Sequence, residues 1–248
     1  MNEHDSAMNL YVPDYYPAFH CIASRCVHTC CAGWEIDIDA ESLARYAGLP
    51  GAFGDRVRRC VSREGAPHFI LAEGERCPLL NGDNLCDLIL HEGEGALCQI
   101  CRDHPRFRNY FSSRVEMGLG LVCEEAARLI LSWPHPLRLI RLKGSAEETP
   151  TEDEQYLFDL RGQWLSSIQE EGPKARLLET LIFRHLPDAL YDGRLEERVD
   201  FIRRAYAEIA GGWTDGDLST LIERARAFSD RVEYDDEALD RWIDGDPA

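Results

Sequence analysis

The spacing of apolar and polar residues differs between the two halves of the chain. Around Trp34, Ile36 and Ile38, and again over 114–121, apolar residues alternate with other residues, which is the period of a half-buried strand. After residue 150 the apolar residues recur every three or four positions, as they do on an amphipathic helix. The first half is therefore predicted to contain strands and the second half to be helical.

Capping residues divide the first half into short elements. A helix is predicted over 40–47, with Asp39 as its N-cap and Gly48 after its end, and a second helix over 51–63. Between them and the next group of cysteines, residues 68–71 have the composition of a strand.

The next elements all involve cysteines or precede one. Asn-Gly-Asp-Asn between Cys77 and Cys86 is typical of a tight turn, so a hairpin would bring these two sulfur atoms toward one point. Strands are expected at 107–111 and 114–121, and a helix begins near Cys123.

The second half is predicted to consist of five helices. Their expected ranges are 151–168, 173–186, 195–209, 214–228 and 237–243.

These elements define a mostly α protein of the α+β class. A Cys-rich metal-binding module with short β-hairpins is expected at residues 1–144, followed by a helical domain at residues 145–248. The boundary lies in the acidic, small-residue stretch 145–150, which is the predicted linker.

Net charge and hydropathy limit the classes of partner that the protein is expected to bind. The 248-residue chain has a formal net charge of −18, which disfavours nucleic acid and anionic membranes because phosphate groups need a cationic face. No run approaches the roughly 20 apolar residues of a membrane-spanning helix, and the acidic start differs from the basic start of a signal peptide. We expect a cytoplasmic protein with no nucleic-acid or membrane partner.

The cysteines carry the candidate chemistry. All ten lie between Cys21 and Cys123, and four of them fall within residues 21–31. Disulfides rarely persist in a reducing cytoplasm, so clustered cysteines indicate metal or iron-sulfur ligands first and redox thiols second. The spacing is compatible with zinc and with an iron-sulfur cluster, and it does not choose between them. Adjacent Cys30 and Cys31 are expected to point in different directions, and Cys98 and Cys101 form a CxxC pair.

Charged residues near the cysteines provide weaker candidates. Glu35 and Asp37 would lie on the outer face of the predicted strand, where they could approach a substrate amine or simply face solvent. A group of arginines could balance thiolate charge on a solvated face, or bind an anionic cofactor or an acidic protein. Its members are Arg56, Arg58, Arg59, Arg63, Arg102, Arg106 and Arg108.

The order of the cysteines resembles that of a known family. The matching motifs are Cys21-x4-Cys26-x3-Cys30-Cys31-x-Gly33-Trp34, then Cys77-Pro-Leu-Leu-x4-Leu-Cys86, then Cys101-Arg-x-x-Pro-Arg106, then Cys123-x-Glu-Ala-Ala-Arg128. This pattern is similar to the flagellin lysine-N-methylase family, within the wider CxxCxxCC group of zinc- or iron-chelating proteins. The resemblance covers residues 11–131 strongly and the tail at residues 218–242 more weakly.

The resemblance implies a cofactor, a reaction and a set of ligands. It implies an iron-sulfur centre of the [4Fe-4S] type, with zinc as the alternative metal, and methyl transfer from S-adenosylmethionine to a lysine amine of flagellin or a related amine substrate. The implied metal ligands are Cys21, Cys26, Cys30, Cys31, Cys77, Cys86, Cys101 and Cys123. Position near the cysteines, and not the resemblance, makes Glu35 and Asp37 the catalytic candidates and Arg102 and Arg106 the cofactor-binding candidates.

The chain departs from the family pattern in three places. It is shorter after Trp133, Cys98 is an additional thiol, and His104 stands where an aromatic residue is usual. Two other functions remain open on the sequence alone. One is a non-enzymatic metal-binding module that is structural or carries metal or electrons; the other is a thiol redox protein that uses Cys98 and Cys101.

Overall fold

A computed structural model describes residues 8–62, 64–145, 147–214 and 216–246. By contacts, the chain divides into two compact units. We call residues 21–104 the Cys-rich unit, and residues up to 20 together with those from 105 onward the helical unit. This division differs from the boundary between residues 144 and 145 that composition suggested.

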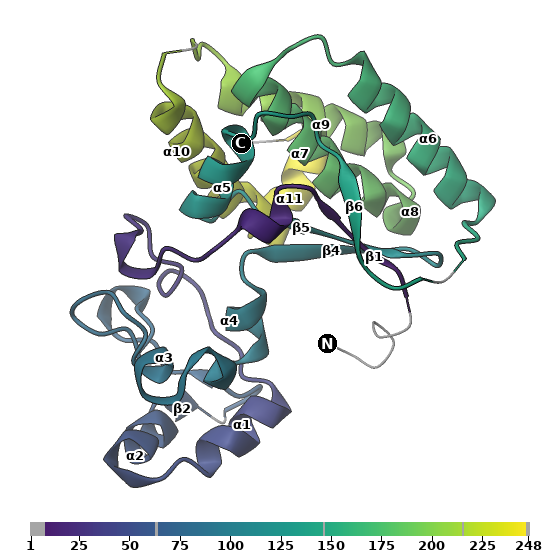
Figure 1. Cartoon of the computed structure of the whole chain (residues 1–248). Helices are drawn as coiled ribbons and strands as arrows, with labels where there is room; N and C mark the ends of the chain where they lie inside the picture. The colour runs from purple at the N-terminus through teal and green to yellow at the C-terminus, as the bar shows by residue number, and fades with distance from the viewer. Residues whose placement is uncertain (1–7, 63, 146, 215, 247–248) are drawn as a thin grey trace. The chain divides into compact units, whose positions relative to one another are not determined.

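One mixed sheet explains why the division differs. Its strand order is β4-β5-β1-β6. The N-terminal strand β1 (Leu10–Pro13) runs parallel to β5 (Val115–Leu119) and antiparallel to β6 (Leu139–Lys143), while β4 (Arg106–Tyr110) pairs antiparallel with β5. The first strand thus lies between segments that come much later, which joins both ends of the chain in the helical unit (Figure 1).

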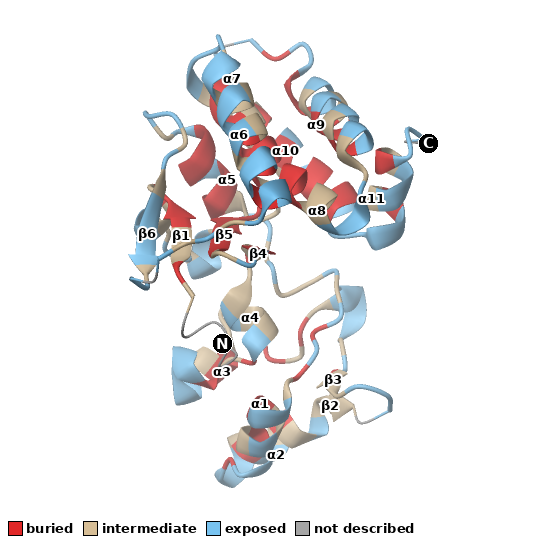
Figure 2. Ribbon diagram, turned by 90° about the vertical axis from the view of Figure 1, so that its right-hand side faces the viewer, coloured by how far each residue is buried: buried red, intermediate tan, exposed pale blue. Residues whose placement is uncertain are grey.

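The helices of this unit gather on one side of the sheet in both views (Figure 1, Figure 2). They are α5 (Glu124–Leu131), α6 (Glu152–Ser167), α7 (Gly172–His185), α8 (Ala189–Asp192), α9 (Leu195–Ala210), α10 (Leu218–Phe228) and α11 (Asp236–Ile243). The sheet meets α7 closely at Gly118, where an added Cβ atom would lie 2.8 Å from the ring of Phe183 and closer still to that of Phe107. A side chain at this position would have to displace both rings, so glycine permits the contact.

A buried ion-pair network lies between the sheet and α6. Glu116 of β5 is fully buried, and its two carboxylate oxygens accept hydrogen bonds from Arg161 of α6 at 2.6 and 2.7 Å. Arg114 also donates to Glu116 at 2.6 Å and pairs with Glu148 at 3.4 Å. The carboxylate is buried only because two guanidinium groups satisfy it.

The Cys-rich unit contains shorter elements and a core of its own. They are α1 (Ala40–Ala47), α2 (Gly51–Arg59), the pair β2 (Val61–Ser62) and β3 (His68–Phe69), α3 (Asp87–Glu92) and α4 (Gln99–Asp103). Ile36, Ile38, Tyr46, Val57 and Leu79 are among its buried residues. Tyr46 donates its hydroxyl hydrogen to the carbonyl of Ala96 at 2.8 Å, which attaches α1 to the segment before α4.

Most predicted elements are confirmed. The helix at 40–47 has the predicted bounds, the strands at 107–111 and 114–121 form β4 and β5, and the five helices of the second half correspond to α6, α7, α9, α10 and α11. The helix expected at 51–63 ends at Arg59, and β6 and α8 were not predicted. Arg63 lies outside the described residues. The mostly α class with small sheets is confirmed.

The strand predicted around Trp34 to Asp39 is wrong. Its backbone forms only one isolated bridge, between Asp37 and His68. The alternation that suggested the strand is nevertheless real, because Ile36 and Ile38 are buried while Glu35 and Asp37 are exposed. The pattern indicates an extended segment with one buried face. Such a segment does not have to be hydrogen-bonded to a neighbouring strand along its length.

Within the described residues, no helix has both the length and the apolar character needed to cross a membrane.

The buried network predicts a large stability loss on removing one partner. We expect Arg161→Met to lower the free energy of unfolding by about 3–5 kcal/mol, because Glu116 would stay buried with one of its two cations gone. Urea unfolding followed by far-UV circular dichroism measures this. Arg203→Met is the control, because Arg203 is 67% exposed and its pair with Asp200 at 3.4 Å contributes at most about 1 kcal/mol. Equal losses in the two variants would contradict the argument.

Candidate functional site

Six thiols share the hydrophobic core of the Cys-rich unit. Cys77 and Cys98 are buried in this core, and Cys31, Cys60, Cys86 and Cys101 pack against it partly buried. All of them except Cys60 are close enough to another thiol to influence its charge. These other five residues come from four separate stretches of the sequence, and we call them the thiol core.

Backbone hydrogen bonds align the first three members. Cys77 donates its N–H to the carbonyl of Cys31 at 2.8 Å, and Ala32 and Arg76 form a bridge beside this bond. The predicted hairpin between Cys77 and Cys86 is present, because Leu80 bridges to Cys86. Its turn is held by Asn81, whose side-chain oxygen accepts the N–H groups of Asp83 and Leu85.

A buried carboxylate supports the hairpin from the other side. Asp87 follows Cys86 directly and is 8% exposed. It accepts a hydrogen bond from Arg56 of α2 at 2.6 Å and one from Asn81 at 2.9 Å. Burial alone would raise the pKa of Asp87, but the bonds from Arg56 and Asn81 outweigh it and lower the pKa. The turn between the two cysteines is therefore fixed to α2 by an ion pair.

The last two thiols belong to the CxxC pair at the start of α4. Cys98 is the N-cap residue and Cys101 lies one turn later, so the sulfur atoms are 3.4 Å apart and share a hydrogen bond. Asp39, the N-cap of α1, holds this turn in place by accepting the N–H of Gln99 at 2.8 Å as well as that of Ser42 at 2.9 Å.

The thiols influence one another electrostatically. Burial raises the pKa of Cys77 to about 12, and negative charge on Cys31, Cys86 or Cys98 would raise it further. The hydrogen bond with Cys101 lowers the pKa of Cys98 to about 7, and the same bond together with burial raises the pKa of Cys101. Cys31 and Cys77 are also close enough to act on Cys101. Several thiolates in this core would thus need a cation among them.

The other predicted ligands lie elsewhere. Cys21 and Cys30 are exposed and Cys26 is partly exposed, so these three do not belong to the thiol core. Cys30 is still close to it, since a hydrogen bond from Cys30 lowers the pKa of Cys31 to about 7, whereas neighbouring side chains were expected to diverge. Cys123 is the N-cap of α5 and packs against the core of the helical unit.

Cys98 was not among the predicted ligands, although it is fully buried and belongs to the thiol core. The sequence signal for it is the CxxC spacing, which the family pattern lacks. Cys60, by contrast, is the C-cap residue of α2, and burial raises its pKa without any influence from another thiol.

The donor chemistry of the thiol core fits a thiophilic metal or cluster. Thiolate sulfur is the ligand that zinc and iron-sulfur centres prefer, and five such donors share one small core. Among the described residues, no three Cys, His, Asp or Glu side chains are already spaced as ligands of one ion. The eight-cysteine ligand set therefore stays a prediction.

The catalytic candidates are accessible but not organised around a reacting atom. The side chain of Glu35 is 67% exposed and lies 4.0 Å from His68. Asp37 is exposed on the same extended segment, where its backbone bridges to His68. Both carboxylates could meet a substrate from solvent, as the alternation predicted.

The arginines do not form one free surface. Arg56 is bound to Asp87, and Arg58 donates to the carbonyl oxygen of Leu49 at 2.7 Å and pairs with Asp55. Arg102 lies in α4 of the Cys-rich unit, whereas Arg106 belongs to β4 of the helical unit and donates to the hydroxyl of Tyr16 at 2.6 Å. Two cofactor-binding candidates thus belong to different units, and Arg106 already has a structural role.

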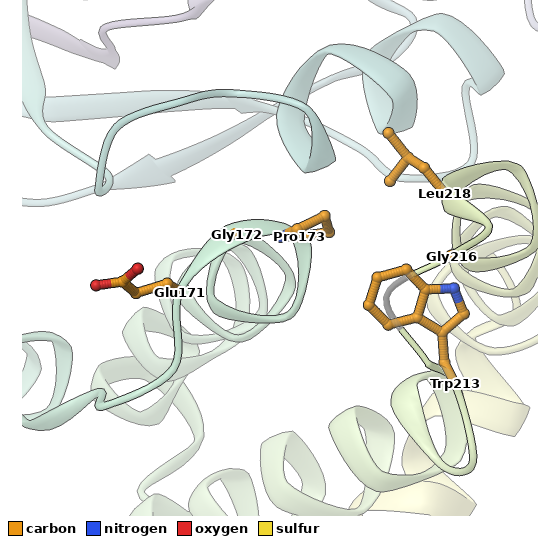
Figure 3. A pocket seen from close by; sticks show the side chains of 6 residues that line it. All are labelled: Glu171, Gly172, Pro173, Trp213, Gly216 and Leu218. Atoms are coloured by element: carbon orange, nitrogen blue, oxygen red, sulfur yellow. The ribbon is translucent and has the colours of Figure 1, made fainter.

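A pocket of about 430 Å³ lies in the helical unit, between the start of α7 and the segment before α10 (Figure 3). Glu171, Gly172, Pro173, Trp213, Gly216 and Leu218 line it. A carboxylate and an indole would suit a cationic sulfonium, but the ammonium of Lys174 already lies 5.6 Å from the Trp213 ring. We therefore assign no donor to this pocket.

Comparison with known proteins supports the resemblance carried by the cysteines. Lysine-N-methylases of Salmonella typhimurium and Salmonella choleraesuis are each 29% identical over 141 residues, covering 51% of this chain and 33% of each relative. Flagellar biosynthetic protein FliU of Salmonella muenchen is 28% identical over 141 residues, which cover 79% of that protein. The chain thus spans about a third of the length of the curated lysine-N-methylases. No family model and no solved structure matches it. The predicted similarity to lysine-N-methylases is confirmed.

Asp39 accepts backbone N–H groups at the starts of both α1 and α4, which predicts that the free energy of unfolding depends on pH. Burial would raise the pKa of Asp39, but the hydrogen bonds from Gln99 and Ser42 outweigh it and lower the pKa to about 2. A depressed carboxyl pKa stabilises the fold above the unfolded value of about 3.9, and the contribution is lost as the pH falls toward 2. We expect Asp39→Asn to cost about 1–2 kcal/mol at pH 6 and much less near pH 2.

Urea unfolding at the two pH values measures this difference, and hydrogen exchange at the Gln99 amide reports the loss of the cap directly. Asp37→Asn is the matched control, because Asp37 is exposed on the same segment. A cost for Asp39→Asn that does not change with pH would rule out the charged cap as its cause.

Proposed function

We propose that this protein is a methyltransferase that acts on the side-chain amine of a lysine in a protein substrate. The observation that carries the proposal is the similarity over 141 residues to proteins named lysine-N-methylase. We propose S-adenosylmethionine as the donor and flagellin as the first substrate to test, the latter supported by the flagellar name of a third relative. Because the alignments cover 33% of the lysine-N-methylases, the activity of those whole proteins is carried over only as a proposal.

The reaction defines what the protein must do. The lone pair of the lysine nitrogen attacks the methyl carbon as the carbon–sulfur bond breaks, so the sulfonium becomes a neutral thioether and the amine loses a proton. Lysine has a pKa of about 10.4 in water, so most of it is protonated at neutral pH and has no lone pair to donate. The protein must orient the amine and accept its proton.

Glu35 and Asp37 are the candidates for orienting the amine. Either carboxylate could accept a hydrogen bond from the lysine ammonium and receive its proton directly or through water. Because a carboxylate by itself favours the charged amine, exclusion of water around the bound lysine would have to lower the lysine pKa. The proximity of Glu35 to His68 provides a second group that could take the proton onward.

The thiol core is the proposed holder of the metal centre. Cys31, Cys77, Cys86, Cys98 and Cys101 would supply the sulfur ligands, with Cys30 close to them. An iron-sulfur cluster is the preferred occupant and zinc the alternative; the cluster would supply Lewis acidity or electron transfer, and zinc would brace the fold. In either case the hairpin and the start of α4 would be tied to the segment that precedes Glu35 and Asp37.

A second function is a metal-binding module without catalytic activity. It is favoured by the fact that the thiols gather in a unit with its own hydrophobic core, while the exposed carboxylates near them form no built site. This module would bind metal as well as the enzyme does but would ignore the methyl donor.

Metal content distinguishes thiols that act as ligands from thiols that only fill space. We expect protein purified without oxygen to contain iron and sulfide, or zinc, and Cys98→Ser to lose at least half of the metal, because Cys98 is the fully buried member of the thiol core and its sulfur lies 3.4 Å from that of Cys101. Metal and sulfide analysis with absorption spectroscopy measures this.

Cys60→Ser is the control for that experiment, because Cys60 is a partly buried thiol of the same unit outside the thiol core. Full metal loading of Cys98→Ser would remove Cys98 from the site. Loss of metal from both variants alike would point to general unfolding instead of ligation.

Methyl transfer tests the proposed reaction itself. We expect metal-loaded protein to transfer label from methyl-labelled S-adenosylmethionine to lysines of flagellin, detected by mass spectrometry as additions of one methyl group. Asp37→Asn should lower turnover about tenfold or more if Asp37 orients the amine or takes its proton. Unchanged turnover with full metal loading would exclude Asp37 from catalysis.

Two negative results have distinct meanings. Metal-loaded protein that binds no donor by calorimetry supports the module without catalytic activity. If the protein binds the donor and methylates a small amine or another protein but not flagellin, the proposed reaction stands and flagellin is not the substrate.

A further inference from the structure

The edge of the sheet at β6 is a cationic region in an acidic protein. Although the chain has 45 acidic and 27 cationic residues, no aspartate or glutamate occurs between Ala126 and Ser145. Arg138, Arg141 and Lys143 fall within this stretch, the last two in β6 itself. None of the three takes part in an ion pair within the described residues. Their charge is therefore available to a partner.

The backbone of β6 also has an unused side. β6 is the last strand in the order β4-β5-β1-β6, so among the described residues β1 alone pairs with it (Figure 1). Asp14 donates its N–H to the carbonyl of Arg138 at 2.8 Å, and the register then runs Pro13 to Leu139, Val12 to Ile140 and Tyr11 to Arg141.

This register fixes which backbone groups point outward. In antiparallel strands, hydrogen-bonded pairs alternate with pairs that are not bonded to each other. Since Asp14 bonds to Arg138, the pair of Val12 and Ile140 is bonded, and the N–H and C=O groups of Leu139 and Arg141 point away from β1. Pro13 has no N–H to donate, which agrees with its place opposite Leu139.

Apolar side chains accompany this free edge. Ile140 is 39% exposed and Leu142 is 49% exposed, and Figure 2 shows β6 as largely exposed at the border of the sheet. Ile140 and its partner Val12 lie on one face of the sheet, and Arg141 and its partner Tyr11 lie on the other. The register shifts between Tyr11 and Leu10, so Lys143 pairs with Leu10 and lies on the face of Ile140. A strand added here would meet a cation on each face and apolar groups between them.

We propose that β6 is a docking edge for an extended acidic segment of a partner polypeptide, which adds to the sheet as a fifth strand. Such a segment would combine acidic and apolar residues, so that carboxylates pair with Arg141 on one face and with Lys143 on the other, while apolar side chains cover Ile140 and Leu142. Backbone hydrogen bonds to Leu139 and Arg141 would give affinity, and the side chains would give selectivity. The proposal does not depend on methyl transfer.

A second copy of this chain is a poorer occupant. Antiparallel pairing of β6 with β6 would place Arg141 and Lys143 of the two copies next to one another, and like charges in adjacent strands are destabilising. Lysine and arginine on an edge strand also discourage such self-association. The same cations that discourage another copy attract an acidic strand, and both effects follow from one charge pattern.

A short peptide of alternating glutamate and valine is the probe, used with the full-length protein. We expect it to bind at low salt, and we expect Arg141→Glu/Lys143→Glu to weaken binding at least about tenfold, because two attractions become repulsions. Arg203→Glu/Arg231→Glu is the matched charge control, since both arginines are exposed on the helices of the same unit. It should bind as well as the unaltered protein.

Backbone readouts separate strand addition from a simple charge effect. On binding, the amide hydrogens of Leu139 and Arg141 should become protected from exchange, whereas that of Ile140 should be protected already in the free protein. A peptide methylated on alternate backbone nitrogens should lose binding when the methyl groups face β6.

Several results would overturn the proposal. They are equal binding of a peptide with lysine in place of glutamate, unchanged binding by the charge-reversed variant, unchanged exchange at Leu139 and Arg141, or a dimer at low salt that Arg141→Glu/Lys143→Glu alters. The last result would assign the edge to a second copy.

Discussion

The packing of five cysteines into one small core, two of them buried and three partly buried, is the constraint on which the Cys-rich unit depends. An uncharged thiol behaves as a small hydrophobic group and can fill such a core without a partner. A thiolate cannot, because burial of an unpaired charge is costly. The same five residues can thus support the fold in two ways, as packed neutral thiols or as thiolates around a cation. Which state holds is decided by whether a cation is bound.

The size of this unit makes the second state important. It spans residues 21–104, which is only slightly above the roughly 70–80 residues below which a single hydrophobic core rarely supplies more than about 3–5 kcal/mol of stability. Its regular elements are short, and all ten cysteines of the chain are free thiols, so no disulfide cross-links it. A bound metal would add the cross-link that small units otherwise obtain from disulfides. In this unit the metal would therefore stabilise the fold and the site together, and substitution of a ligand would affect both.

The sequence predicted local elements better than it predicted which of them come together. Asp39 capping α1, the turn between Cys77 and Cys86, and the helices after residue 150 depend on neighbouring residues, so their signals lie within a few positions. The parallel pairing of β1 with β5 depends on segments far apart in sequence, and composition gave no sign of it. For the same reason the predicted boundary followed the change in composition, whereas the contacts follow the sheet. The buried Glu116 was also missed, because its partner Arg161 lies in another element.

The sequence predicted the chemistry of the candidate site but not which cysteines form it. Clustered cysteines in a chain of this composition indicated a thiophilic centre, and the motif indicated the right relatives. Spacing alone could not show that Cys98 lies in the core, that Cys21 is exposed, or that Cys123 packs in the helical unit. These outcomes depend on which face of each short segment the core covers. A motif records the residues that a family shares, whereas the core also contains a residue, Cys98, that lies outside the motif.

Net charge is an average over the whole chain, so it does not show where charges of one sign gather locally. A charge of −18 argues against a nucleic-acid partner, because such binding needs a broad cationic face. It does not argue against an acidic polypeptide, because strand addition involves only one edge and a few side chains. Charges beyond about 8–10 Å are screened at physiological salt, so an incoming strand responds mainly to Arg141 and Lys143 next to it. At low salt the distant acidic residues would repel the same strand. Screening of this repulsion by added salt would therefore oppose the loss of local attraction, and the salt dependence of binding should be shallower than two cations alone would give.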